Sequence, residues 1–195
     1  TRGDLKLLLG MPFTRRDVVL GSFAGRVVLV CASVFAGVAA ATLLALLRGA
    51  PVAFDTLLAA TALVCVLGVV FVALSIAISA SVSTTTRSGA IAMGAFFLFA
   101  FDLWRQVPRV VLYVVNGFRF PGQVPDWVPF VAHLNPVLAF RDAMRPVLPA
   151  ITSFGGSVEG ALPVYRTVPF ALVLLALWVV VPLVLGVRRF DRTDL

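Results

Sequence analysis

Charged residues are scarce in this chain, and their scarcity excludes an ordinary soluble domain. Only 13% of the 195 residues are charged, whereas 61% are hydrophobic and the mean hydropathy is +1.04. In a soluble domain about a quarter of all residues are charged and about half are apolar. The net charge of +7 does not indicate a nucleic-acid partner, because the basic residues lie mainly between long apolar runs. The composition therefore predicts an integral membrane protein.

Cysteine and histidine are nearly absent, which argues against a disulfide framework and against a metal centre. Cys31 and Cys65 both lie inside apolar runs, and the chain has no CxxC pair that could bind zinc. We interpret both as small packing residues within helices. His133 is the only histidine, and the three methionines are scattered, so a copper or haem site is not expected. The sequence predicts no metal site in this chain.

Motifs of catalysis are missing as well. Lys6 is the only lysine, and it lacks the glycines that precede the lysine of a phosphate-binding loop. No serine nucleophile motif accompanies a histidine on a neighbouring apolar run, and no single run carries paired carboxylates. We therefore expect that this chain is not an enzyme and has no catalytic residues.

Four apolar runs predict helices that cross a bilayer. The runs 27–47, 56–82 and 168–187 contain no charge. A helix of about 20 residues is long enough to cross the hydrocarbon core, which is roughly 30 Å thick. A further run is uncharged only over 90–101, so we extend its helix over 88–109 to reach the far interface. The predicted fold is an all-α integral membrane protein with four transmembrane helices.

The distribution of arginine predicts which helix ends face the cytosol. Positive residues gather in the segment 1–25 and the tail 188–195, and the turn 83–89 holds Arg87, whereas the first hairpin turn on the opposite side has only Arg48. The positive-inside rule places the arginine-rich side in the cytosol. We expect one transmembrane domain in the cell membrane, with both ends cytosolic and with residues 102–167 on the outer side.

The predicted outer segment holds short apolar stretches that cannot cross the membrane. Residues 110–118 and 136–148 are apolar, and their length is typical of interfacial or re-entrant helices. Asn135 and Pro136 favour a helix start, because Asn is a preferred N-cap and Pro is preferred at the first helical position.

Charged residues near this segment are candidates for a transport pathway or an outer gate. Asp102, Arg105 and Arg109 have the spacing i, i+3 and i+7, which places them on one face of a continuous helix. Charge at bilayer depth costs roughly 2.5–3.5 kcal/mol, so it is usually paired or lines a wet cavity. The alternative is an outer helix end whose arginines extend to the interface. Arg141 and Asp142 are the other candidates, and we expect them to fix the re-entrant helix rather than to touch substrate.

Four stretches resemble ABC-2 type transporter permeases, in the bacterial and archaeal branch related to the permease of the copper-maturation system of nitrous oxide reductase. The first is GDLKLLLGMPFTRRDVVLG, similar to the cytosolic segment between the second and third spans of that family, with Thr14 in place of a serine and Phe23 departing from the pattern. Residues 79–87 resemble the polar turn, residues 133–145 the LNP and DA[LM]R signature, and residues 188–195 the terminus. In the first stretch the matching residues are Leu5, Lys6, Leu7, Leu8, Leu9, Gly10, Pro12, Arg15, Arg16, Asp17 and Gly21.

The resemblance implies a six-span permease of which this chain supplies spans three to six, so we expect two more spans before Thr1. Residues 3–10 would form a coupling helix that docks on a separate ATPase subunit. That subunit would bind ATP and magnesium, and this chain would bind no cofactor. Two permeases, identical or different, would pair and move a substrate outward; the resemblance does not identify the substrate. The residues expected to contact the ATPase are Asp4, Leu5, Lys6, Leu7, Leu8, Leu9, Gly10, Arg15 and Arg16.

Two other classes of protein stay open at this point. The short apolar helix near the start could lie on the membrane surface, in a non-transporting scaffold or anchor of the same topology. A secondary transporter would need coupled charges within its spans, and the three uncharged spans argue against that class.

Overall fold

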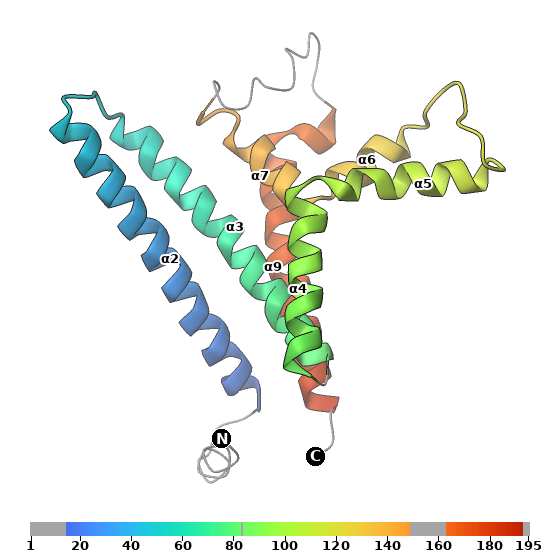
Figure 1. Cartoon of the computed structure of the whole chain (residues 1–195), viewed down its shortest axis with the longest axis horizontal. Helices are drawn as coiled ribbons and strands as arrows, with labels where there is room; N and C mark the ends of the chain where they lie inside the picture. Colours follow the sequence, from blue (N-terminus) through green and yellow to red (C-terminus); the bar gives the residue numbers. More distant parts are fainter. Residues whose placement is uncertain (1–14, 83, 149–162, 193–195) are drawn as a thin grey trace.

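The described part of the chain is a bundle of long helices with short helices gathered at one end. The computed structural model describes residues 15–82, 84–148 and 163–192, and no strand occurs among them. The long helices are α2 (Arg15–Leu47), α3 (Phe54–Ser81), α4 (Thr85–Ala100) and α9 (Val168–Arg192) (Figure 1). The short elements are η1 (Leu103–Arg105), α5 (Gln106–Val115), α6 (Trp127–His133), α7 (Pro136–Met144) and η3 (Val164–Arg166).

The three uncharged runs of the sequence are confirmed as membrane-spanning helices by length and composition. The spans are Val19–Leu47, Phe54–Ser81 and Val168–Arg189. Their outward surfaces carry exposed apolar side chains, such as Leu29, which is 69% exposed. In water such surfaces would be unfavourable, whereas lipid tails accept them. The all-α membrane fold predicted from the sequence is therefore confirmed.

The predicted helix over 88–109 is wrong in its second half. Helix α4 ends at Ala100, and the pair 85–100 and 103–115 is bent by 74°. Asp102 lies at the bend with a φ of 56°, a left-handed conformation that interrupts a right-handed helix. Pro108 gives the physical reason. Proline has no backbone N–H, so a continuous helix through residue 109 would lack one of its hydrogen bonds at Pro108. In the first turn of a separate helix α5 the backbone N–H groups make no intrahelical bond, so a proline there costs none.

The ends of the helices separate into two groups. The start of α2, the end of α3, the start of α4 and the end of α9 lie together, and the α2–α3 turn and the short helices lie at the other end (Figure 1). This grouping agrees with the expected clustering of the arginine-rich segments on one side. The assignment of that side to the cytosol stays a prediction.

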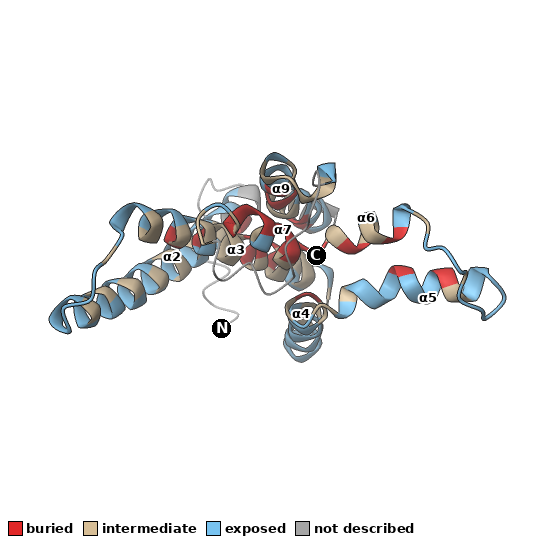
Figure 2. Cartoon of the chain, turned by 90° about the horizontal axis from the view of Figure 1, so that it is seen from above, coloured by how far each residue is buried: buried red, intermediate tan, exposed pale blue. Residues whose placement is uncertain are grey.

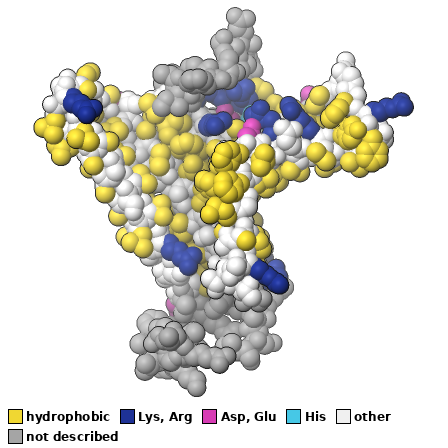
Figure 3. Space-filling model, viewed as in Figure 1, with side chains coloured by type: hydrophobic (Ala, Val, Ile, Leu, Met, Phe, Trp, Pro, Cys, Tyr) yellow, Lys and Arg dark blue, Asp and Glu magenta, His cyan; other side chains and the backbone are white. Residues whose placement is uncertain are grey.

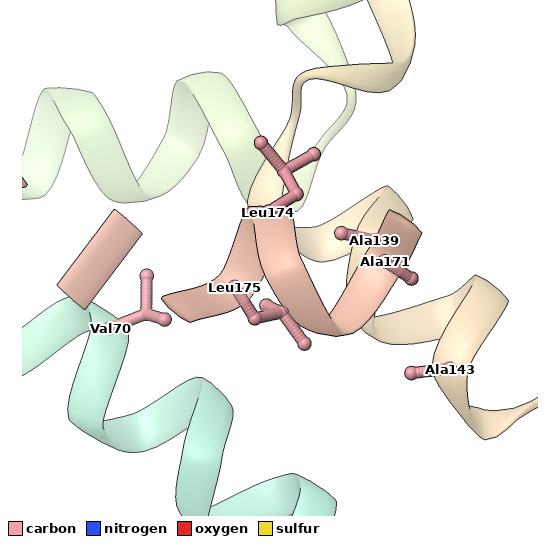
Figure 4. Packing of buried hydrophobic residues seen from close by; sticks show 6 residues of the cluster. All are labelled: Val70, Ala139, Ala143, Ala171, Leu174 and Leu175. Atoms are coloured by element: carbon pink, nitrogen blue, oxygen red, sulfur yellow. The ribbon is translucent and has the colours of Figure 1, made fainter. Parts of the chain in front are cut away.

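Small side chains anchor the short helix α7 to the bundle. Ala139 and Ala143 of α7 pack against Ala171 and Leu175 of α9 (Figure 4). Small residues let helix backbones approach closely, which strengthens van der Waals packing within a membrane. Seen from above, buried residues concentrate where α3, α7 and α9 meet, whereas the outer faces of α2, α4 and α5 are exposed (Figure 2). Helix α7 is therefore part of the core despite its length.

The absence of a side chain at Gly68 of α3 makes room for Val30 of α2. A Cβ atom on Gly68 would lie 2.6 Å from Cγ1 of Val30. We expect Gly68→Ala to push the two helices apart and to lower stability by about 1–3 kcal/mol, because the β-branched Val30 has few other rotamers. Thermal unfolding of the purified protein in detergent measures the change.

A compensating substitution makes this prediction specific. Val30→Ala in the Gly68→Ala background removes the clashing methyl groups and is expected to restore much of the melting temperature. Gly37→Ala is the matched control, since no atom lies within 4 Å of a Cβ there. A Gly68→Ala protein that melts like the Gly37→Ala protein would contradict the close packing.

Candidate functional site

Asn135 joins three segments at the end of the bundle that carries the short helices. Its side chain is buried, with 0% exposure, and its Oδ1 accepts a hydrogen bond of 2.8 Å from the backbone N of Val137. Its Nδ2 donates to the carbonyl oxygen of Phe99 at 3.1 Å and to Oδ1 of Asp102 at 3.3 Å. The predicted N-cap of α7 is thus confirmed, and the same side chain also ties α7 to the end of α4.

The bend after α4 is held by side chains from two neighbouring elements. Asp102 accepts from Asn135 and forms an ion pair with Arg105, with 2.8 Å between Arg105 Nη2 and Asp102 Oδ2. Trp104 donates from Nε1 to the carbonyl oxygen of Val131 at 2.8 Å, which fixes η1 against α6. These contacts stabilise the left-handed backbone conformation of Asp102. That conformation is unfavourable for most residues other than glycine.

A second charged cluster surrounds Asp142, which is 6% exposed on α7. Arg145 Nη2 donates to Asp142 Oδ1, and Arg166 Nε lies 4.0 Å from the same oxygen. Arg145 also donates to the carbonyl oxygen of Arg166 at 3.3 Å, which links α7 to η3. Burial raises the pKa of Asp142 above its usual value, and electrostatic interactions with Arg145, His133 and Arg166 offset only part of that effect.

Helices α5 and α6 border a cavity of about 940 Å³. Basic and hydroxyl groups line part of it, apolar side chains line the rest, and none of these described lining residues is acidic. The rings of His133 and Tyr165 contact each other in a tilted arrangement near it, with ring centroids 4.8 Å apart. The lining residues are Arg105, Gln106, Arg109, Val110, Leu112, Tyr113, Phe120, Pro121, Val124, Val128, Pro129, Ala132, His133 and Arg166.

The structure separates the five charged residues that the sequence grouped as pathway candidates. Arg105 and Arg109 line the cavity, and Asp102 lies at the bend. Because the helix is broken there, the expectation that these three share one face of a continuous helix is wrong. Asp142 belongs to the cluster on α7, whereas Arg141 is exposed. The expectation that these two residues fix that helix stays a prediction.

Sequence reasoning missed two arginines that the structure brings to the site. Arg145 lies three residues after Asp142 on the same helix, and that spacing could have indicated the pair. Arg166 follows in a separate segment and reaches both the cavity and Asp142. No periodicity or motif connects Arg166 to α7, so only the fold could reveal it.

Other predicted sites fall partly outside the described residues. The expected ATPase contacts Asp4, Leu5, Lys6, Leu7, Leu8, Leu9 and Gly10 lie there, and so do the side chains of Arg15 and Arg16, whose backbone opens α2. Over the described ranges, no group of three or more His, Cys, Asp or Glu residues could hold a metal ion. Cys31 and Cys65 are free thiols on α2 and α3.

Comparison with known proteins gives one family and one curated relative. The family model described as "ABC-2 family transporter protein" matches residues 1–195. The probable ABC transporter permease protein NosY of Stutzerimonas stutzeri is 29% identical over 205 residues, which cover 97% of this chain and 68% of that protein. No solved structure gives a significant match.

Proposed function

Since the chain belongs to the ABC-2 family of transporter proteins, we propose that its helices export a substrate under the drive of a separate ATPase subunit. Family membership confirms the resemblance found in the sequence, and it makes the chain a multi-pass membrane permease subunit. The observation that carries the proposal is that the match spans the full length, including the segment expected to couple to the ATPase. In the proposal, ATP and magnesium are bound by that partner.

The length and contacts of α2 support a mechanical connection from the coupling segment to the bundle. Helix α2 has 33 residues and is therefore about 50 Å long, more than the roughly 30 Å hydrocarbon core. Near its start, Val19 is buried against Val72 and Ile76 of α3, and Val187 of α9 packs on the same cluster. In the proposal, a displacement of residues 3–10 moves α2 and, through this cluster, also α3 and α9. Movement of packed helices relative to one another is how the protein would change between two conformations.

The charge distribution supports the proposed membrane placement. A broad apolar surface lies between basic side chains at the two ends of the helices (Figure 3). Arg26 and Arg188 lie near the end that carries the start of α2 and the end of α9. In the proposal this end is cytosolic, because basic residues in short segments beside the spans are retained on that side and the short α2–α3 turn at the other end has only Arg48. A second permease subunit, identical or different, completes the translocation unit.

The proposal is tested by isolating tagged full-length protein from native membranes and identifying what co-purifies. An ATPase with a phosphate-binding loop is expected in near-equal amount. Leu7→Asp combined with Leu8→Asp should abolish this association, because two carboxylates cannot enter an apolar groove without a large desolvation penalty. Leu7→Met with Leu8→Met keeps the apolar surface and should retain the ATPase.

The alternative is a non-transporting scaffold of the same topology. It predicts that no ATPase accompanies the unaltered protein, or that the two aspartates leave the association unchanged. Either result, obtained at equal membrane levels of each variant, would replace the transporter proposal with the scaffold.

A further inference from the structure

The arm formed by α5 and α6 has the placement of an interfacial element. Helix α4 has 16 residues and rises about 24 Å, so the bend at Asp102 lies near the far edge of a hydrocarbon core of roughly 30 Å. From there α5 turns sideways and extends away from the bundle beside α6 (Figure 1). It exposes Val110, Val111 and Val114, at 57%, 47% and 51%. An amphipathic helix with such a face lies in the plane of the membrane surface.

The cavity bordered by this arm has more positive charge than the acidic residues of the described ranges neutralise. Arg105 is paired with Asp102, and Arg166 shares Asp142 with Arg145. Arg109 has no acidic partner within the described part of the chain. The Nε atom of Arg166 is buried and has no hydrogen-bond partner among the described residues. That atom lies 4.0 Å from Oδ1 of Asp142. The guanidinium that lines the cavity without an acidic partner in the described ranges is therefore that of Arg109, which can donate to an added anion.

The remaining walls of the cavity favour an anion that carries an apolar part. Val110, Phe120 and Val124 line it beside the arginines, and each of the three also has an exposed surface. Phe120 and Val124 are 71% and 61% exposed. The cavity therefore continues into the apolar surface of the arm, where lipid acyl chains lie. A small inorganic anion would use only the basic part of a cavity of about 940 Å³.

We propose that this cavity binds the phosphate headgroup of an anionic glycerophospholipid from the leaflet in which the arm lies. Guanidinium groups of Arg109 and Arg166 would donate to the phosphate oxygens, a geometry for which arginine is suited. The acyl chains would follow the valine face of α5. Such a lipid would hold the arm to the bundle, and the proposal does not depend on ATP-driven export.

The test uses full-length protein purified in detergent, stripped of lipid and titrated with defined lipids under native mass spectrometry. Phosphatidylglycerol is expected to bind about tenfold more tightly than phosphatidylcholine, and its binding should weaken as salt rises. Arg109→Gln should reduce phosphatidylglycerol binding about tenfold, the effect of losing one hydrogen bond to a charged group. Arg109→Lys keeps the charge but loses the planar fork, so an intermediate affinity is expected.

Arg119→Gln is the matched control, because Arg119 is exposed on the same arm and does not line the cavity. Equal loss in the Arg109 and Arg119 variants would overturn the proposal in favour of general attraction to the arm. Equal binding of the two lipids would also overturn it. Displacement of phosphatidylglycerol by inorganic phosphate at equal concentration would assign the site to a free anion. Co-purification of the ATPase, measured on the same samples, separates these outcomes from a failure of the proposed function.

Discussion

Replacing Asn135 with Ala is expected to lower the free energy of unfolding by about 1.5–2.5 kcal/mol, because the N-cap and the Nδ2 hydrogen bond to the carbonyl of Phe99 are lost together. The cap bond to the backbone N of Val137 contributes about 1 kcal/mol. Loss of the Nδ2 donor removes one of two hydrogen bonds to the carbonyl oxygen of Phe99, which still accepts from the backbone N of Asp102 at 3.2 Å, and this costs about 0.5–1.5 kcal/mol. Asp102, 25% exposed at its side chain, can still reach water and Arg105.

Three variants separate the parts of this effect in thermal unfolding of the purified protein. Asn135→Ser keeps an oxygen acceptor for the cap, so it should recover about 1 kcal/mol relative to Asn135→Ala. Asn116→Ala is the matched control, since Asn116 is exposed and donates only to the carbonyl of Leu112 on its own helix. It should change stability by less than about 0.5 kcal/mol. Equal effects of Ala at positions 135 and 116 would show that Asn135 does not connect α4 to α7.

Arg145→Met is expected to lower stability by about 2–3 kcal/mol at neutral pH. The substitution leaves the buried carboxylate of Asp142 without its nearest cation and removes the bond to the carbonyl of Arg166. Breaking a fully buried ion pair costs about 3–5 kcal/mol, and the 29% exposure of the Arg145 side chain reduces the expected value. Arg141→Met is the control, because Arg141 is exposed on the same helix.

The pH dependence of this loss follows from the pKa of Asp142. Burial raises that pKa, so the folded protein keeps the proton to a higher pH than the unfolded chain, whose usual value is 3.8. The contribution of Asp142 to stability is therefore fully present below about pH 3.8 and is lost as pH rises through the raised pKa. Arg145→Met removes a charge that lowers this pKa, so the loss should grow between pH 4.5 and pH 7.5.

A double substitution checks this reasoning. Asp142→Asn mimics the protonated acid, so in the Arg145→Met background it should restore stability at pH 7.5 and remove the added pH dependence. Melting curves at the two pH values provide the measurement. A single Arg145→Met variant with the same loss at both pH values would contradict a role for the Asp142 charge.

Prediction from sequence succeeded where one residue and its near neighbours decide the structure. Asn135 and Pro136 start α7 because their cap and first-turn preferences act within two residues. The uncharged runs form spanning helices because a long apolar segment in lipid must satisfy its backbone internally. The bend at Asp102 was within reach of the sequence through Pro108, but the apolar run before it suggested a longer helix.

Membership of the chain in a transporter family and its membrane class were determined by the sequence itself, through composition, apolar run lengths and ordered motifs. Those properties depend on transfer of apolar surface to lipid and on short patterns, neither of which needs contacts between distant residues. Tertiary structure alone decided that Arg109 and Arg166 line one cavity and that Asn135 holds Phe99 and Asp102. The two residues of each of these pairs are more than thirty positions apart in the sequence; Asn135 and Phe99, for example, are 36 positions apart. Their meeting depends on the 74° bend and on the packing of α7 against α9, which no local pattern encodes.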